Sequence, residues 1–188
     1  NHVGDVGAIL ADTGFAVGQA HAMRLRESLL RLNKRLTGHR FLRGVVVPGG
    51  LTVAVGEAAL VPELRRLIAD FDEIVAISLA NTLVADRLED TGRLPEAVAR
   101  DFGVVGYVAR ACGLPQDVRT DYPSAAYRRI AALPTVALTG DVQARTLVRV
   151  REIGESLGLI ERAIAASGSS AALRVDIGPL PPFTMGFG

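Results

Sequence analysis

Three long segments of this chain repeat apolar residues with the period of an α-helix, and they constrain its fold more than any other feature. The segments are residues 2–37, which contain no proline, residues 61–90 and residues 140–166. Pro62 falls in the first turn of the second segment, where a helix tolerates proline. Helices of this length are about two to three times longer than the average in globular proteins. The sequence therefore predicts a bundle of long helices.

The rest of the chain predicts minor β-structure and no domain boundary. Residues 45–47, which precede Pro48-Gly49-Gly50, predict a short strand that ends in a turn, and residues 173–177 predict another. Aromatic residues make up only 5% of the chain and hydrophobic residues 49%, so Ala, Val, Leu and Ile must build the core. No uncharged apolar run reaches the roughly 18 residues that span a membrane. We expect a mainly α fold, a long-helix bundle with minor short β-strands, as a single helical domain over residues 1–188.

Two lines of residues stand out on the segment 2–37. Small residues at helical spacing predict a groove that another helix can approach closely: Gly7, Ala11, Gly14, Gly18 and Ala22. Polar residues seven positions apart predict a seam along one continuous helix: Asp5, Asp12, Gln19 and Arg26. Periodicity leaves two interpretations of this seam. It is either a solvated face or, if the turn around Asp12 is buried, a place where a carboxyl group can relay protons.

A second polar line follows the last predicted helix. Its members share one face of that helix: Asp141, Arg145, Arg149, Glu152 and Ser156. Asp141 favours the helix N-terminus, and Arg149 can pair with Glu152 at a spacing of three. The simplest interpretation is an exposed, salt-bridged face.

A turn-rich segment, residues 110–119, carries a further group of charges. We interpret Arg110, Asp117 and Arg119 as the charges that brace this loop. Cys112 lies in the same segment without an obvious base, which favours a small core residue over a nucleophile.

Several functions find no support in the composition or the motifs. The formal net charge of +1 gives no reason to expect nucleic acid as a partner. The single cysteine cannot form a thiolate-rich metal site, and no HExxH, CxxC or CxxH motif is present. We find neither a nucleotide-binding glycine motif nor a serine-nucleophile elbow. We therefore expect no metal site within these residues.

Two ordered blocks carry a resemblance to a known family. The first comprises residues 1–8, Asp12, Arg26-Glu27, Gly38-His39-Arg40 and residues 47–50. The second comprises Gly106, Arg110, Gly113, residues 117–119, Pro123, Tyr127, Gly140-Asp141, Ala144-Arg145, Arg149, Glu152 and Ser156. This order resembles the family that unites the quinone-site subunit of respiratory complex I with the large subunits of membrane-bound [NiFe] hydrogenases. Asp12-Thr13-Gly14-Phe15 and the run 25–33 look more like the formate hydrogenlyase type.

The resemblance implies that a parent oxidoreductase passes electrons from an iron–sulfur cluster of a partner subunit to quinone or to protons. It implies quinone or a NiFe centre in the parent, whose metal-binding cysteines lie outside this block. It places Asp12 beside a buried redox cavity as a proton-relay or quinone-cavity residue. Other cavity or structural candidates are Asp5, Arg26, Arg110, Asp117, Arg119, Asp141, Arg145, Arg149 and Glu152. Partners would be an iron–sulfur small subunit and membrane subunits, on the cytoplasmic, inner face of the cell membrane.

Asn1 in place of an initiator Met and the Pro-rich end at residues 178–188 suggest an excised middle fragment that is inactive alone. We therefore also expect the fragment to form a homodimer through the small-residue groove or apolar helix faces. Two rival hypotheses remain. One is a non-catalytic assembly or scaffold paralogue within a membrane-bound redox complex. The other, an independent small-molecule enzyme, lacks a catalytic constellation in this sequence.

Overall fold

The computed structural model describes residues 1–54, 59–167, 172–179 and 181–183. Within the Pro-rich end, residue 180 and residues 184–188 lie outside the described residues. The long helices are α1 His2–Asp12, α2 Ala16–Thr37, α3 Leu60–Leu79 and α8 Val142–Ala166. The shorter elements are β1 Val46–Val47, β2 Gly50–Leu51, α4 Thr82–Leu88, α5 Glu96–Asp101, α6 Gly106–Ala111, α7 Val118–Asp121 and the 3-10 turn η1 Ala125–Arg128. The predicted mainly α fold with minor short strands is confirmed.

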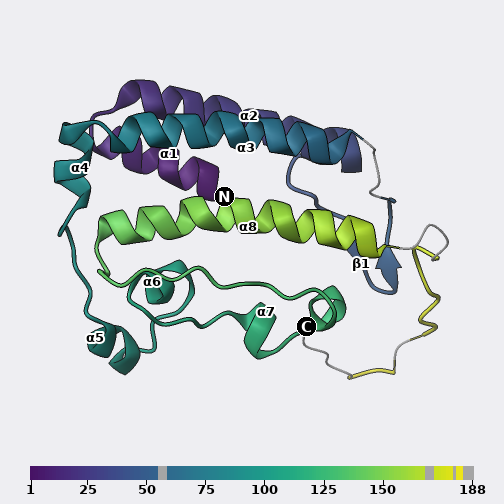
Figure 1. Cartoon of the computed structure of the whole chain (residues 1–188). Helices are drawn as coiled ribbons and strands as arrows, with labels where there is room; N and C mark the ends of the chain where they lie inside the picture. Colours follow the sequence, from purple (N-terminus) through teal and green to yellow (C-terminus); the bar gives the residue numbers. More distant parts are fainter. Residues whose placement is uncertain (55–58, 168–171, 180, 184–188) are drawn as a thin grey trace.

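The helices lie in layers (Figure 1). Helices α1, α2 and α3 form the upper layer, α8 runs beneath them, and the short helices α5, α6 and α7 lie on the far side of α8. Helix α8 contacts α1, α3, α4 and α6, and therefore joins the upper and lower layers. The main core lies among the upper helices and includes the fully buried side chains of Val6, Leu10, Leu25, Phe71 and Leu88.

The prediction of one continuous helix over residues 2–37 is wrong, because the chain reverses at residues 13–15. Gly14 has a φ of 81°, which is left-handed backbone that favours glycine. The Thr13 hydroxyl donates to the Leu10 carbonyl at 2.9 Å, and the Phe15 amide donates to the same carbonyl at 2.8 Å. Helix α2 then packs back along α1. The polar seam is therefore divided between two helices and does not form one line.

The small residues are explained by this reversal. A Cβ at Gly7 would lie 2.9 Å from the Ala22 side chain, and one at Gly18 would lie 2.8 Å from Leu10. Both distances are shorter than real Cβ contacts allow, so the glycines permit the close approach of α1 and α2. The small-residue groove is thus filled by the chain's own second helix and is not free for a second copy.

The predicted helix over residues 61–90 is also divided, at Ala80 and Asn81. The Asn81 side chain caps α4 by accepting a hydrogen bond from the Leu83 amide at 3.0 Å. Near the end of α3, Ile77 is 53% exposed, whereas Ser78 is buried and donates a hydrogen bond to the Ile74 carbonyl.

The β-structure is a single antiparallel hairpin within the described residues. Val46 pairs with Leu51, and Gly49 in the turn has a φ of 91°. The strand predicted at residues 173–177 is wrong, since this segment makes only an isolated bridge from Arg174 to Gly50. A Cβ at Gly50 would collide with the Leu173 carbonyl oxygen, so the close approach requires glycine.

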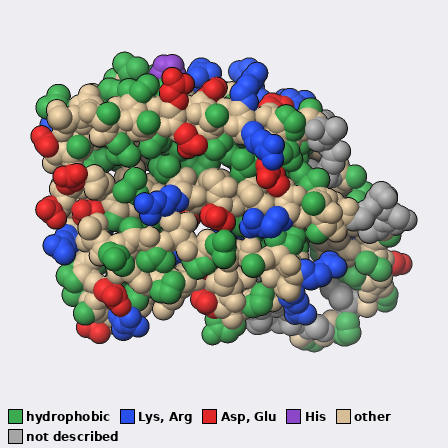
Figure 2. Space-filling view, in the orientation of Figure 1, with side chains coloured by type: hydrophobic (Ala, Val, Ile, Leu, Met, Phe, Trp, Pro, Cys, Tyr) green, Lys and Arg blue, Asp and Glu red, His purple; other side chains and the backbone are tan. Residues whose placement is uncertain are grey.

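Apolar side chains gather between the upper helices and α8 on the face drawn in Figure 2. They line a groove of about 200 Å³ that includes Leu29, Ile68, Leu157 and Ile160. Self-association of the chain through such apolar helix faces stays a prediction. Among the described helices, none has the length and the apolar character that crossing a membrane would require.

Candidate functional site

The first turn of α1, the segment from α6 to α7 and the middle of α8 meet around a cavity of about 800 Å³. We call it the α1–α8 cavity. Its lining residues are His2, Val105, Gly106, Arg110, Gln116, Asp117, Val118, Arg119, Asp121, Tyr122, Glu152 and Ser156. Its inner wall is charged and buried, whereas Val105, Val118 and Tyr122 are exposed apolar side chains.

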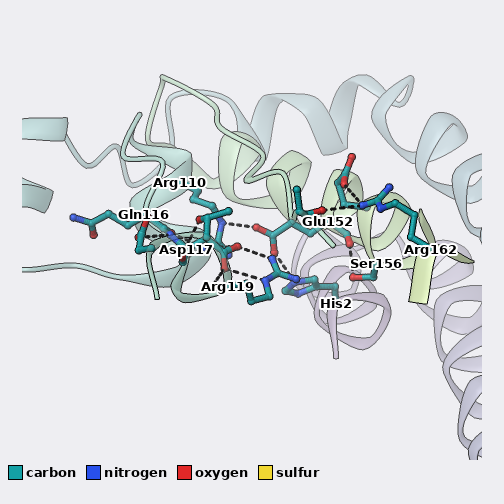
Figure 3. Close-up of polar contacts among 12 residues, drawn as sticks. His2, Arg110, Gln116, Asp117, Arg119, Glu152, Ser156 and Arg162 are labelled. Carbon is teal, nitrogen blue, oxygen red and sulfur yellow. Dashed lines mark hydrogen bonds and ion pairs between the residues drawn. The ribbon is translucent and has the colours of Figure 1, made fainter. Parts of the chain in front are cut away.

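Glu152 lies at the centre of the charged wall (Figure 3). Arg110 Nε donates to Glu152 Oε1 at 2.5 Å, and His2 Nε2 lies 2.8 Å from Glu152 Oε2. Glu152 is only 7% exposed. Burial raises the pKa of this carboxyl group, but the hydrogen bonds from His2 and Arg110 outweigh burial and lower the pKa overall. Glu152 is therefore an ionised, hydrogen-bonded carboxylate that joins three elements.

The loop between α6 and α7 is braced as predicted. Arg110 Nη1 donates to the Gln116 carbonyl at 3.0 Å and lies 4.0 Å from Asp117 Oδ2. Arg119 forms two hydrogen bonds with Asp117, with Nε at 2.9 Å from Oδ1 and Nη2 at 2.6 Å from Oδ2. The Arg119 hydrogen bond lowers the pKa of Asp117, despite the opposing effect of burial. The same pair raises the pKa of Arg119.

Arg149 extends the network toward the surface. Its guanidinium carbon lies 3.5 Å from the centre of the Tyr107 ring, a cation–π contact. Arg149 Nε lies 3.7 Å from Asp5 Oδ2, and His2 Nδ1 lies 3.6 Å from the same oxygen. Both nitrogens are buried and lack a hydrogen-bond partner among the described residues. Two buried nitrogens thus converge on the half-exposed carboxylate of Asp5.

Asp141 and Arg145 lie apart from this cavity, at the start of α8. Asp141 Oδ1 accepts the Ala144 amide at 2.7 Å and the Thr139 hydroxyl at 2.9 Å, as an N-cap residue does. Burial raises the pKa of Asp141, but these hydrogen bonds and one from the Asp90 amide lower it overall. Arg145 donates to the carbonyls of Gly140 and Gly92. Both residues fasten the start of α8 to the preceding loop.

The cavity network thus brings together six of the candidates proposed from the sequence: Asp5, Arg110, Asp117, Arg119, Arg149 and Glu152. Asp12 and Arg26 are exposed and do not join them. Asp12 lines a different cavity of about 530 Å³, beside Asp86 and Arg87.

Two further expectations about α8 are wrong. The line from Asp141 to Ser156 is not an exposed face, because Asp141, Arg149 and Glu152 are all buried. Glu152 directs its two oxygens to Arg110 and His2, and no ion pair with Arg149 is formed among the described residues.

Cys112 is a buried core residue, and burial raises the pKa of its thiol.

Sequence reasoning missed His2 and Tyr107 as members of the site. His2 contacts Glu152, which lies 150 positions away in the sequence, so no local spacing of residues predicts this contact. The spacing of three between His2 and Asp5 was the available signal. Within the described residues, no group of three or more His, Cys, Asp or Glu side chains is arranged to hold a metal ion.

Known proteins share this architecture. A chain in the solved structure of the membrane-bound sulfane sulfur reductase, an archaeal respiratory membrane complex, superimposes with a TM-score of 0.81 at 24% identity. The match covers 97% of this chain and 50% of that chain. The fold is therefore one that also occurs in a respiratory complex.

The family follows from the sequence comparison. The family model described as "Respiratory-chain NADH dehydrogenase, 49 Kd subunit" matches residues 12–176, and the chain belongs to this family. NADH-quinone oxidoreductase subunit 4 of Thermus thermophilus is 33% identical over 168 residues, which are 87% of this chain and 41% of that protein. An NADH-quinone oxidoreductase subunit of Anaplasma marginale is 30% identical over 168 residues, 87% of this chain and 42% of that protein. The chain thus spans about two fifths of the length of these curated relatives.

The buried carboxylates predict a loss of stability in acid. Glu152, Asp117 and Asp141 all have a lowered pKa in the folded chain, so the stability they contribute is present above their ordinary values and lost as pH falls through the folded values. We expect the urea midpoint to fall progressively below pH 4.5, the ordinary value for glutamate.

Asp141→Asn is the matched variant for this prediction. Asparagine keeps the N-cap acceptor for the Ala144 amide but turns its NH2 group toward the Asp90 amide, which then loses its acceptor, so the variant should lose about 1–3 kcal/mol at neutral pH. Because asparagine does not titrate, the variant should also show a weaker acid dependence than the unchanged chain. An unchanged acid dependence in this variant would show that Asp141 does not contribute to the effect.

Proposed function

We propose that this chain is part of the large subunit of an oxidoreductase that passes electrons from an iron–sulfur cluster in a partner subunit to quinone or to protons. The observation that carries the proposal is the family match over residues 12–176. The names of the relatives favour quinone as the acceptor. The leaning toward the formate hydrogenlyase type, with a NiFe centre in the parent, stays a prediction.

In this proposal the chain does not catalyse the reaction by itself. The α1–α8 cavity offers charged groups that are paired with one another and, among the residues that the structure describes, no nucleophile with its base. The network instead holds the start of α1, the 110–119 loop and α8 in one fixed arrangement. Electrons would enter from the cluster of a small subunit, and membrane subunits would hold the assembly at the inner, cytoplasmic face of the cell membrane.

Asp12 keeps its proposed role as the proton-relay residue, although this chain leaves it exposed. It lies in the last turn of α1, before the Thr13–Phe15 reversal, and lines the cavity of about 530 Å³ together with Thr91. In the whole subunit, other segments would have to cover this carboxylate. A carboxyl group at a redox cavity can then pass protons to the reduced acceptor.

Asp12→Asn tests this role in the intact enzyme. The amide cannot carry a proton, so quinone reduction should fall by about 100-fold or more, while the amount of assembled complex stays unchanged. Asp101→Asn, at the exposed end of α5, is the control and should keep full turnover. Asp12 is not the relay residue if both variants turn over equally.

A non-catalytic assembly paralogue is the second candidate function. The observation that favours it is the mutual pairing of the buried charges, which is what a structural brace requires. Isolation of the assembly through a tag on this protein separates the two functions. Electron paramagnetic resonance then follows a reduced iron–sulfur cluster in the isolated assembly. Loss of the reduced-cluster signal when quinone is added supports the oxidoreductase. An assembly that contains the cluster but never reoxidises it with quinone or protons supports the scaffold.

A further inference from the structure

A strongly basic stretch surrounds the loop that follows α2. Residues 28–56 contain five Lys and Arg residues and no Asp or Glu. The loop itself, residues 38–44, connects the C-terminal end of α2 to the hairpin, at the end of the bundle where α8 also ends (Figure 1). We call residues 38–44 the basic loop. Neither the α1–α8 cavity nor the proposed relay residue uses it.

Two cations, one in the basic loop and one in the last turn of α2, are free to meet a partner. Arg40 and Arg31 are paired with Glu27, and Arg35 is paired with Glu63. Among the described residues, neither Lys34 nor Arg43 has an ion-pair partner. These two residues lie with Arg40 and Phe41 around a cavity of about 280 Å³. The size and charge of this cavity fit an acidic side chain.

The basic loop is held in a defined shape. Arg40 donates two hydrogen bonds to Glu27, at 2.8 and 2.7 Å, and its carbonyl accepts Asn33 Nδ2 at 3.1 Å. The hydrogen bonds from Arg40, and then from Arg31, lower the pKa of Glu27 to about 2, so this pair persists at any physiological pH.

The same loop displays apolar side chains to solvent. Phe41 is 57% exposed and Leu42 is 47% exposed. Leu42 has a φ of 57°, which a side-chain-bearing residue rarely adopts, and the bond from its amide to the His39 carbonyl at 3.1 Å holds it there. Aromatic residues and arginine are enriched at protein interfaces, and this loop presents Phe41 and Arg43 close together.

Helix capping accounts for only part of this arrangement. Lys34 and Arg35 offset the helix dipole in the last turn of α2, and Gly38 ends the helix with a φ of 80°. Phe41, Leu42 and Arg43 come after the cap and contribute nothing to it. Their exposure therefore needs another explanation.

We propose that the basic loop is a docking point for an acidic surface of a partner protein, with Phe41 and Leu42 entering an apolar recess and Lys34 and Arg43 facing carboxylates. An anionic membrane fits less well, since two unpaired cations and two apolar side chains give little attraction to lipid, whereas the fixed loop shape gives specificity. The inference rests on the proposed function only in that the partner would be a subunit of the same complex.

Photo-cross-linking in cells that express the whole protein tests this docking point. Benzoylphenylalanine replaces Phe41 in one strain and Phe102, an 81% exposed aromatic on the opposite layer, in a control strain. We expect position 41 to form an adduct with an acidic segment of one protein subunit. Arg43→Glu should lower the adduct yield by about 10-fold or more, and Arg66→Glu, at an exposed position of α3, should leave it unchanged.

Three cross-linking results would overturn the proposal. They are an absence of adduct at position 41, a protein adduct insensitive to Arg43→Glu, and an adduct with lipid only. Flotation of the purified chain with phosphatidylserine-containing vesicles, if Phe41→Ala abolishes it, would likewise replace the protein partner by a membrane. An active iron–sulfur complex without the adduct removes the docking point and leaves the proposed function intact. An adduct in an assembly without iron supports the docking point and removes the proposed function.

Discussion

Replacing Arg110 by methionine is expected to lower the free energy of unfolding by about 3–5 kcal/mol, because it leaves the Glu152 carboxylate buried with one partner fewer. Glu152 is 7% exposed, so the carboxylate stays largely desolvated after the guanidinium is lost, and only water admitted by the α1–α8 cavity can partly replace it. The substitution also removes the bond to the Gln116 carbonyl. Urea denaturation, followed by far-ultraviolet circular dichroism, measures the change.

Two variants isolate the cause of this loss. Arg100→Met breaks an exposed pair with Glu96 at a spacing of four, and should cost only about 0–1 kcal/mol. Glu152→Leu combined with Arg110→Met removes both buried charges, and should recover part of the stability lost in the single variant. If Arg110→Met and Arg100→Met cost the same, the buried pair does not brace the chain.

Gly140→Ala is expected to be the second costly change. A Cβ at Gly140 would collide with the Leu94 carbonyl oxygen, and the φ of 68° is unfavourable for alanine. Left-handed backbone costs alanine about 1–2 kcal/mol, and overpacking adds about 1–3 kcal/mol, so the total is roughly 2–5 kcal/mol. The clash also opposes the hydrogen bond from the Leu94 amide to the Gly140 carbonyl, which is 2.9 Å long.

Gly103→Ala is the matched control for Gly140→Ala. Gly103 has a φ of 59°, close to that of Gly140, but a Cβ there would meet nothing within 4 Å. Its substitution should therefore show only the backbone contribution of about 1–2 kcal/mol. Thermal unfolding of both variants separates the two effects. Equal losses would mean that the chain around Leu94 relaxes without cost.

Helix type and helix location could be predicted from periodicity, but the two interruptions could not. The Thr13–Phe15 reversal depends on one left-handed glycine among several in the segment, and glycines packed inside a helix pair give the same sequence signal as a glycine at a turn. The seven-residue spacing from Asp5 to Arg26 is therefore no proof of a continuous helix. Asn81 before Thr82 was a capping signal that the apolar pattern around it concealed.

The candidate site was predictable where its partners are close in sequence. The Asp117–Arg119 brace is such a local contact. The contact of Glu152 with His2 joins residues 150 positions apart, and the contact with Arg110 joins residues 42 apart. Pairings of this kind follow from how helices stack, which periodicity does not specify. For this reason the buried face of α8 was mistaken for an exposed one.

The long-range contact between His2 and Glu152 also has a consequence for the order in which the chain matures. The α1–α2 hairpin can form as soon as it leaves the ribosome, but α1 meets α8 only after some 150 residues have been made. At about 5–20 residues per second, the interval is on the order of 10–30 s. During that time the first hairpin keeps an apolar face uncovered. A chaperone that recognises nascent apolar helices would therefore act on the α1–α2 hairpin, long before α8 has been made.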